Sequence, residues 1–155
     1  MPNPLAYSFS ELRLELFPSR SDYYTSCPQG IGKDMVACLR ALRNLTELHV
    51  SMANDTWLSS SLGQALKRSP VRFPDIKKLR MSGVHNGGHL IRACPSVRHL
   101  SILCELDRDW KSALREIRHM RGLTCVELTN LRGWKPALLI GEGRNDNVFS
   151  GCAEC

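Results

Sequence analysis

The same spacing of apolar residues occurs four times along the chain. Each nine-residue segment begins with Leu, Phe, Cys or Met and has apolar residues at its fourth, seventh and ninth positions. The four segments are LRNLTELHV (42–50), FPDIKKLRM (73–81), CPSVRHLSI (94–102) and MRGLTCVEL (120–128). A weaker copy, FSELRLEL, places Phe9, Leu12 and Leu14 at the corresponding positions. Self-similarity at intervals of a few tens of residues is typical of proteins built from stacked repeats.

The seventh and ninth positions predict a short strand in every copy. They are apolar and the residue between them is polar, as expected where the side chains of a strand alternate between its two faces. The fourth position then belongs to the turn that enters the strand. We expect residues 48–50, 79–81, 100–102 and 126–128 to form neighbouring, parallel strands.

Between these strands the apolar residues follow the period of a helix instead. The helical segments are 33–42, 57–68, 87–94 and 109–120, of which 87–94 has room for only about two turns. Neither a single strand nor a single helix can bury its apolar face alone, so stacking of successive units is expected. The pattern therefore predicts an α/β right-handed solenoid with short parallel strands backed by helices. A doubly wound sheet is the structural alternative, and the short strands and constant apolar turn position favour the solenoid.

Two segments carry a resemblance to a known family. The LxxLxL spacing of 45–50 and 97–102 resembles leucine-rich repeats, and the variable repeat lengths resemble the irregular repeats of fungal F-box and leucine-rich-repeat proteins. The F-box helices themselves are not visible in the sequence. The resemblance implies a horseshoe segment over residues 1–140 and a substrate-recognition role in an F-box-type ubiquitin ligase. The remaining residues, 141–155, lack periodicity and are predicted to be a disordered tail.

Charge and hydropathy limit the choice of partners. The formal net charge is +6 at pH 7, but the lysines and arginines are scattered and form no dense basic block. No apolar run approaches the ~18 residues that span a bilayer, and the N-terminus lacks the pattern of a secretory signal. We therefore expect an intracellular protein, in cytoplasm or nucleus, with no membrane contact.

The polar strand positions are the candidate binding surface. They face away from the helices on the side that is concave in a horseshoe, and a central basic zone is flanked there by acidic residues. Such a surface suits an acidic or phosphorylated segment of a protein partner. The predicted partner-binding residues are His49, Lys78, Arg80, His99, Ser101 and Glu127.

Catalytic, metal and cofactor sites are not predicted. The seven cysteines include one CxxC, Cys152 and Cys155, which has no second pair of ligands nearby. The histidines lack the HExxH spacing, and no nucleophile is paired with a base. The sequence thus favours a protein-binding scaffold without enzymatic activity. A basic nucleic-acid-binding module is the first alternative, and a small α/β enzyme is the second.

Overall fold

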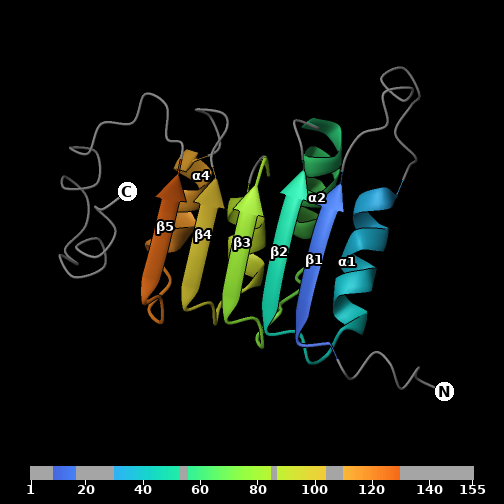
Figure 1. Ribbon diagram of the computed structural model, residues 1–155. Helices are drawn as coiled ribbons and strands as arrows, with labels where there is room; N and C mark the ends of the chain where they lie inside the picture. Colours follow the sequence, from blue (N-terminus) through green and yellow to red (C-terminus); the bar gives the residue numbers. More distant parts are fainter. Residues whose placement is uncertain (1–8, 17–29, 53–55, 85–86, 104–109, 130–155) are drawn as a thin grey trace.

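Strands and helices alternate through the part of the chain that the structure describes. The computed structural model describes residues 9–16, 30–52, 56–84, 87–103 and 110–129 (Figure 1). The elements are β1 (Glu11–Leu16), α1 (Ile31–Ala41), β2 (Glu47–Met52), α2 (Thr56–Arg68), β3 (Lys78–Ser82), α3 (Gly88–Ala93), β4 (His99–Leu103), α4 (Trp110–Ile117) and β5 (Cys125–Thr129). The predicted tail, 141–155, lies outside the described residues.

The five strands form one parallel sheet in which spatial order equals sequence order. The predicted seventh positions are neighbours across it, with Leu48 beside Leu79 and Leu79 beside Leu100. The weaker copy is also a strand of this sheet, because Leu12 pairs with Leu48 in the same register. The prediction of neighbouring, parallel strands is therefore confirmed.

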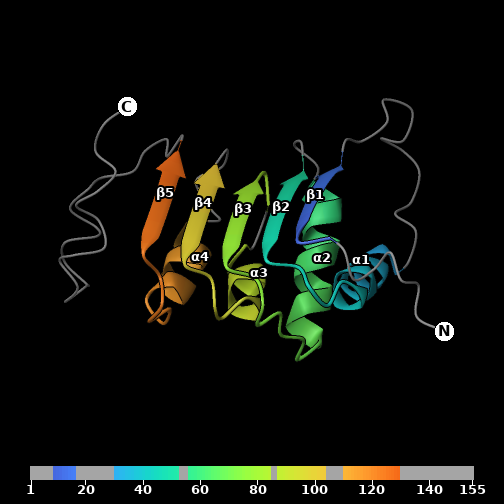
Figure 2. The ribbon, with the colours of Figure 1, turned by 60° about the horizontal axis from the view of Figure 1, so that its bottom comes forward.

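The four helices form a second layer that covers one face of the sheet (Figures 1 and 2). Successive helices contact each other, α1 with α2, α2 with α3 and α3 with α4. A doubly wound sheet has helices on both faces and a reversal of strand order. Neither feature occurs among the described elements. In Figure 1 α2, α3 and α4 lie behind the strands, whereas α1 lies to the right of β1. Each following strand lies to the left of the one before it, which gives the right-handed connection favoured between parallel strands.

The backbone repeats together with the side-chain pattern. We call each strand with the turn that enters it a rung. In every pair of neighbouring rungs one carbonyl accepts two N–H groups from the next rung, at 2.7–3.1 Å. The accepting carbonyls are those of Ser10, Thr46, Lys77 and Arg98. They occupy equivalent places, so the rungs are related by structure as well as by sequence.

The core lies between the two layers and is built from the repeated apolar positions. The fourth-position side chains Leu45, Ile76, Val97 and Leu123 are at most 8% exposed. Phe9 differs, because it is 53% exposed although it occupies the same place in the weaker copy. It lies on the first described rung, where no further described strand covers it. Phe9 therefore does not repeat the packing of the other fourth-position side chains.

The helix boundaries differ slightly from the predicted ones. Helix α1 begins at Ile31, two residues earlier than predicted, and α4 ends at Ile117 although the prediction extends to residue 120. Met120 instead lies in the turn into β5, and its N–H donates to the carbonyl of Ile117 at 3.0 Å. Its apolar side chain continues to contact the core from the turn, which explains why the helical pattern seemed to continue.

Two glycines allow neighbouring helices to approach closely. A Cβ on Gly32 of α1 would lie 2.6 Å from the backbone carbonyl carbon of Ser61 in α2. A Cβ on Gly88 of α3 would lie 2.7 Å from the backbone oxygen of Ser112 in α4. Real Cβ atoms do not approach other atoms so closely, so these two positions require glycine. None of the helices described here is both long enough and apolar enough to cross a membrane.

Candidate interaction surface

The sheet face that points away from the helices presents three rows of side chains, and we call it the open face. Neighbouring side chains within a row are ~5 Å apart and successive rows are ~7 Å apart, as the geometry of a sheet requires. From β1 to β5 the first row holds Glu11, Glu47, Lys78, His99 and Cys125, the second Arg13, His49, Arg80, Ser101 and Glu127, and the third Glu15, Ser51, Ser82, Leu103 and Thr129.

All six predicted partner-binding residues lie in the first two rows. Arg80 is flanked by His49 on β2 and by Ser101 on β4, and Glu127 follows Ser101 on β5. Lys78 and His99 are neighbours in the adjacent row. The register of the sheet therefore brings together residues that are up to 78 positions apart in the sequence.

The cations of this group differ in their surroundings. The Lys78 ammonium is 3.0 Å from the Glu47 carboxylate, so much of its charge is already balanced. Arg13 forms an ion pair with Glu15 on its own strand. Arg80 is exposed and has no acidic partner within 4 Å among the residues described. Arg80 is thus the cation of the open face that is best placed to meet an incoming anion.

The surroundings of His49 favour its neutral form. Its partial burial lowers its pKa below the ordinary value of 6.5, and the positive charges of Arg13 and Arg80 lower it further. A neutral imidazole has one donor and one acceptor nitrogen. Near neutral pH, His49 therefore offers hydrogen bonds beside Arg80 without adding a second charge.

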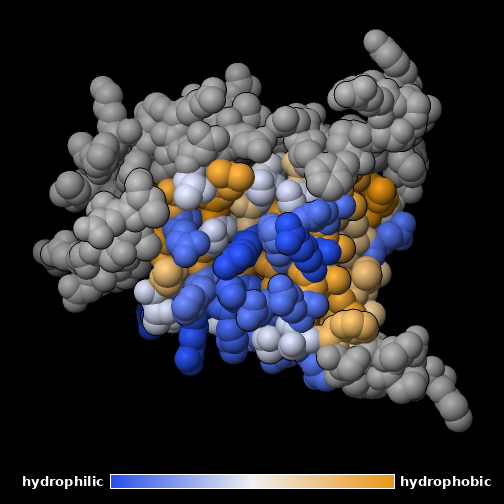
Figure 3. Space-filling view, in the orientation of Figure 1, coloured by the Kyte–Doolittle hydropathy of each residue, from blue (hydrophilic) through white to orange (hydrophobic). Residues whose placement is uncertain are grey.

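The open face as a whole is not basic. Figure 3 shows hydrophilic side chains over its centre. The three rows together hold four glutamates against three lysines and arginines. Elsewhere on the described residues, twelve exposed lysines and arginines stand against Asp34, Asp75 and Glu116. The surplus of positive charge therefore lies away from the open face, on the helices and turns. The predicted basic zone is local to β2, β3 and β4.

The cysteines of the described segments have separate surroundings. Cys94 is fully buried, and burial raises the pKa of its thiol to about 12. Cys38 is exposed on α1, and Cys125 lies half-buried on the open face. Within these segments no three His, Cys, Asp or Glu side chains come close enough to hold a metal ion. The CxxC pair, Cys152 and Cys155, lies outside them.

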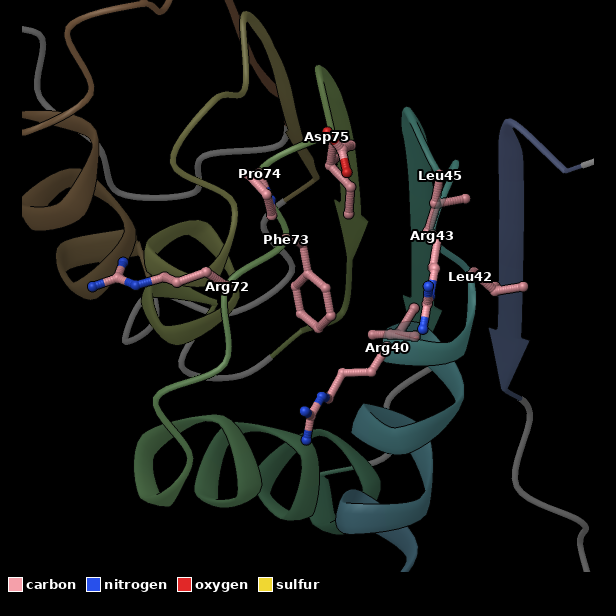
Figure 4. Close-up of a pocket in the computed structure, with 10 residues that line it drawn as sticks. Arg40, Leu42, Arg43, Leu45, Arg72, Phe73, Pro74 and Asp75 are labelled. Atoms are coloured by element: carbon pink, nitrogen blue, oxygen red, sulfur yellow. The ribbon is translucent and has the colours of Figure 1, made fainter. Parts of the chain in front are cut away.

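A cleft that the sequence did not predict opens where β2 and β3 begin (Figure 4). Its volume is about 310 Å³, and the turns that lead from α1 into β2 and from α2 into β3 form its walls. The lining residues are Leu39, Arg40, Leu42, Arg43, Leu45, Arg72, Phe73, Pro74, Asp75 and Ile76. We call it the edge cleft. The two walls are about thirty residues apart in the sequence, and the only local sign was the pair of arginines at the end of a predicted helix.

Comparison with known proteins gives no match: no protein-family model, no curated protein and no solved structure matches the chain.

Proposed function

We propose that this chain is a leucine-rich-repeat-like, right-handed solenoid segment that binds another protein through its open face. The equivalent backbone hydrogen bonds between successive rungs support a repeat ladder. The sequential strand order supports it too, because each repeat of a solenoid contacts only its neighbours. In this reading the helices form the outer layer and the open face forms the binding surface.

The single observation that carries the binding function is the position of Arg80. It lies at the centre of the open face with His49 and Ser101 on either side, and it lacks an acidic partner among the described residues. A guanidinium group beside neutral hydrogen-bonding side chains suits a carboxylate, which it can bind in a bidentate manner. Glu47 and Glu127 lie on either side of this centre and would disfavour a partner that is acidic throughout. We therefore propose an acidic segment of limited length on a protein partner.

The resemblance to F-box and leucine-rich-repeat proteins extends this proposal to a cellular role. The chain would act as an adaptor that recognises a substrate for ubiquitination, in the cytoplasm or the nucleus. Leu48 and Leu100, which carry the LxxLxL resemblance, are both 1% exposed and line up across the sheet through Leu79. That agreement supports the repeat, and the adaptor role follows from the resemblance alone.

Affinity capture with the full chain as bait tests the proposed function. Arg80→Glu should abolish recovery of the partner, because it places a negative charge where the partner's carboxylate binds. Lys33→Glu is the matched control, since Lys33 is exposed in the first turn of α1, on the other layer. It makes the same change of charge and should leave recovery unchanged. Equal recovery with both variants would rule out the open face as the binding surface.

Binding to nucleic acid is the second candidate, and the distribution of charge favours it. Outside the open face, twelve exposed lysines and arginines on the helices and turns outnumber the three acidic residues described there. Contacts between such residues and phosphates weaken steeply as salt increases. A titration of single-stranded DNA and RNA oligonucleotides at several salt concentrations checks this candidate. Tight binding at low salt that falls with a steep slope supports it, and no binding at low salt excludes it.

A further inference from the structure

We propose that the edge cleft binds a phosphorylated side chain of the protein partner, so that the partner has a second contact beside the open face. This inference rests on the proposed function, because it names a chemical feature of the same partner. The edge cleft lies at the turns where β2 and β3 begin, and the same two strands then contribute side chains to the open face. We therefore infer that one extended segment of the partner contacts both.

Two arginines supply the charge of the edge cleft. Arg40 is in the last turn of α1 and Arg43 is in the turn that follows, and Figure 4 shows both on the same side of the cleft. Both are exposed, and neither has an acidic partner within 4 Å among the described residues. Their guanidinium groups are therefore available to an anion from solution.

Arg72 also lines the cleft, but its side chain makes a structural hydrogen bond instead. Its side chain extends away from Phe73 in Figure 4, and its Nη1 donates a hydrogen bond to the backbone carbonyl of Arg92 near the end of α3. That contact fixes Arg72 and satisfies a carbonyl group that the helix leaves free at its end. Arg72 thus adds positive charge to the wall but is not the proposed ligand-binding group.

A simpler explanation for the presence of Arg40 and Arg43 is that their positive charges stabilise the C-terminal end of the α1 dipole. The C-terminal end of a helix carries about half a negative charge. One arginine would more than balance it, and Asp75 is the one acidic residue among the described residues that line the cleft. With Arg72 included, positive charge therefore exceeds negative charge by roughly one and a half units. This surplus is larger than helix stabilisation needs.

The shape of the cleft narrows the choice of ligand. The buried side chains of Leu39, Leu45 and Ile76 also line the cleft. Figure 4 shows the ring of Phe73 directed toward the cleft from the other wall. Such a site suits an apolar stem with an anionic end. At about 310 Å³ the cleft is at the small end of ligand pockets, which are about 300–1,000 Å³, so it fits one side chain better than a longer polymer.

Phosphate suits the paired arginines better than a carboxylate does. A phosphomonoester carries about −1.5 to −2 charges at pH 7 and has three acceptor oxygens, so it can face two guanidinium groups at once. A carboxylate has one charge and two oxygens, which a single arginine can satisfy. The open face, with Arg80 alone at its centre, suits a carboxylate, and the edge cleft suits a phosphate.

Fluorescence anisotropy of the full chain with peptide pools tests this site. The probes are fluorescein-labelled peptides with phosphoserine, phosphothreonine or phosphotyrosine at a fixed central position and random flanking residues. The unphosphorylated pools and pools with a central glutamate serve as references. At least one phosphorylated pool should bind ~10-fold or more tightly than its references, because charge-assisted hydrogen bonds to the phosphate are lost in them. Equal binding of phosphorylated and unphosphorylated pools would overturn the proposal.

Three variants locate the binding. Arg40→Ala combined with Arg43→Ala should weaken binding of the phosphorylated pool ~10-fold or more. Arg40→Lys with Arg43→Lys keeps the charge but loses the planar fork, so an intermediate loss is expected. The control, Lys33→Ala with Arg115→Ala, removes two exposed charges elsewhere on the helix layer and should change affinity less than twofold. Circular dichroism shows whether each variant is folded, and equal losses in the first variant and the control would overturn the site.

Two further measurements separate this inference from the alternatives. The difference in affinity between phosphorylated and unphosphorylated pools should persist in the Arg80→Glu variant, because that difference is set at the edge cleft and not at Arg80. A failure of the open face in affinity capture would therefore not by itself remove the edge cleft. Oligonucleotides should not displace the phosphopeptide at physiological salt. If an oligonucleotide binds the cleft arginines with a steep salt dependence and no phosphopeptide pool binds, the site belongs to nucleic acid and the proposal is overturned.

Discussion

At the scale of single residues, the position in a rung decides the chemistry of each side chain. Cys94 and Cys125 show this clearly, because both are cysteines at the edges of apolar segments. Cys94 takes the first position of its rung and is buried between the layers, whereas Cys125 is half-buried on the open face. The same thiol is therefore a core side chain in one place and a surface group in the other.

The burial of Cys94 gives a prediction about thiol reactivity. Its pKa of about 12 leaves only about one molecule in ten thousand as the reactive thiolate at pH 8. Iodoacetamide should modify exposed Cys38 in the folded protein and leave Cys94 untouched, as peptide mass spectrometry would show. Both should react after denaturation in urea. Modification of Cys94 at the rate of Cys38 would contradict its place in the core.

The ion pair between Arg92 and Glu116 predicts how stability depends on pH. The Arg92 guanidinium holds the pKa of Glu116 below its ordinary value of 4.5 through a hydrogen bond from Nε to Oε2 at 3.0 Å. The lowered pKa means that the pair stabilises the fold above about pH 4.5, and this stabilisation is lost as the pH falls through the pKa of the folded state. The Arg92 side chain is 54% exposed, so solvent screening limits the effect to about 0.5–1 kcal/mol.

Denaturant unfolding of Glu116→Gln checks this prediction. At pH 7 the variant should be less stable than the wild type by that amount, and the difference should shrink as the pH falls through the lowered pKa of Glu116 in the folded state. A difference that stays constant across this range would show that the hydrogen bond, and not the charge, is what matters.

At the scale of elements, each helix and strand is fixed by contacts with its neighbour in the next unit. Helices α1 and α2 meet at Gly32 and helices α3 and α4 at Gly88, and the strands meet through backbone bonds and aligned aliphatic rows. Since no strand or helix buries its apolar face alone, these contacts between units supply most of the stability.

The close contact of α1 with α2 predicts the effect of a single methyl group. Gly32→Ala should destabilise the fold by about 1–3 kcal/mol, because its Cβ would overlap the backbone at Ser61. The better helix propensity of alanine, worth about 1 kcal/mol at most, offsets only part of this cost. Gly122→Ala is the control, since nothing lies within 4 Å of its Cβ. Thermal or urea unfolding distinguishes the two, and a Gly32→Ala protein as stable as the control would refute the contact.

The strand register predicts opposite effects at adjacent positions. Leu100 is 1% exposed in the core, so Leu100→Ala should cost about 2–5 kcal/mol of unfolding free energy. Ser101 lies on the open face, and Ser101→Ala should change stability by less than about 0.5 kcal/mol. Both values come from urea unfolding curves. Similar losses at the two sites would mean that the register is shifted by one residue.

At the scale of the whole molecule, burial is greatest in the central strands of the described sheet and lower in its two outer strands, β1 and β5. The inward side chains of β1, Leu12 and Leu14, are half-buried, whereas the corresponding Leu79 and Met81 of β3 are at most 3% exposed. On β5, Leu128 is again half-buried. Burial thus rises from each outer strand toward the centre of the sheet.

Hydrogen exchange should follow this gradient of burial. A chain of units that contact only their neighbours opens most readily at its ends. Backbone amides of β3 should therefore exchange slowest, and those of β1 and β5 should exchange fastest, as measured by mass spectrometry of deuterated peptides. Uniform protection across all five strands would indicate a single cooperative core and would argue against the solenoid.

Much of this architecture could be predicted from the apolar pattern because that pattern is periodic. Leu48, Leu79 and Leu100 recur at the same place in short segments with a two-residue period, which only a strand with one buried face explains. The six predicted partner-binding residues follow from the same register, because residues that flank or separate the buried positions of a strand face the other way. The ends of the helices follow less directly from the pattern. Met120, for example, is apolar and packs against the core although α4 ends at Ile117.

The sequence by itself therefore determined the alternation of strands and helices, the rows of buried residues and the candidate residues of the open face. Only the tertiary structure decided which charges meet. It paired Lys78 with Glu47, left Arg80 without an acidic partner among the described residues, and placed Arg40 and Arg43 beside Phe73 in the edge cleft. The physical reason is that apolar periodicity is local in the sequence and repeats in every unit. Ion pairs and clefts arise between units, where distances depend on how the rungs stack.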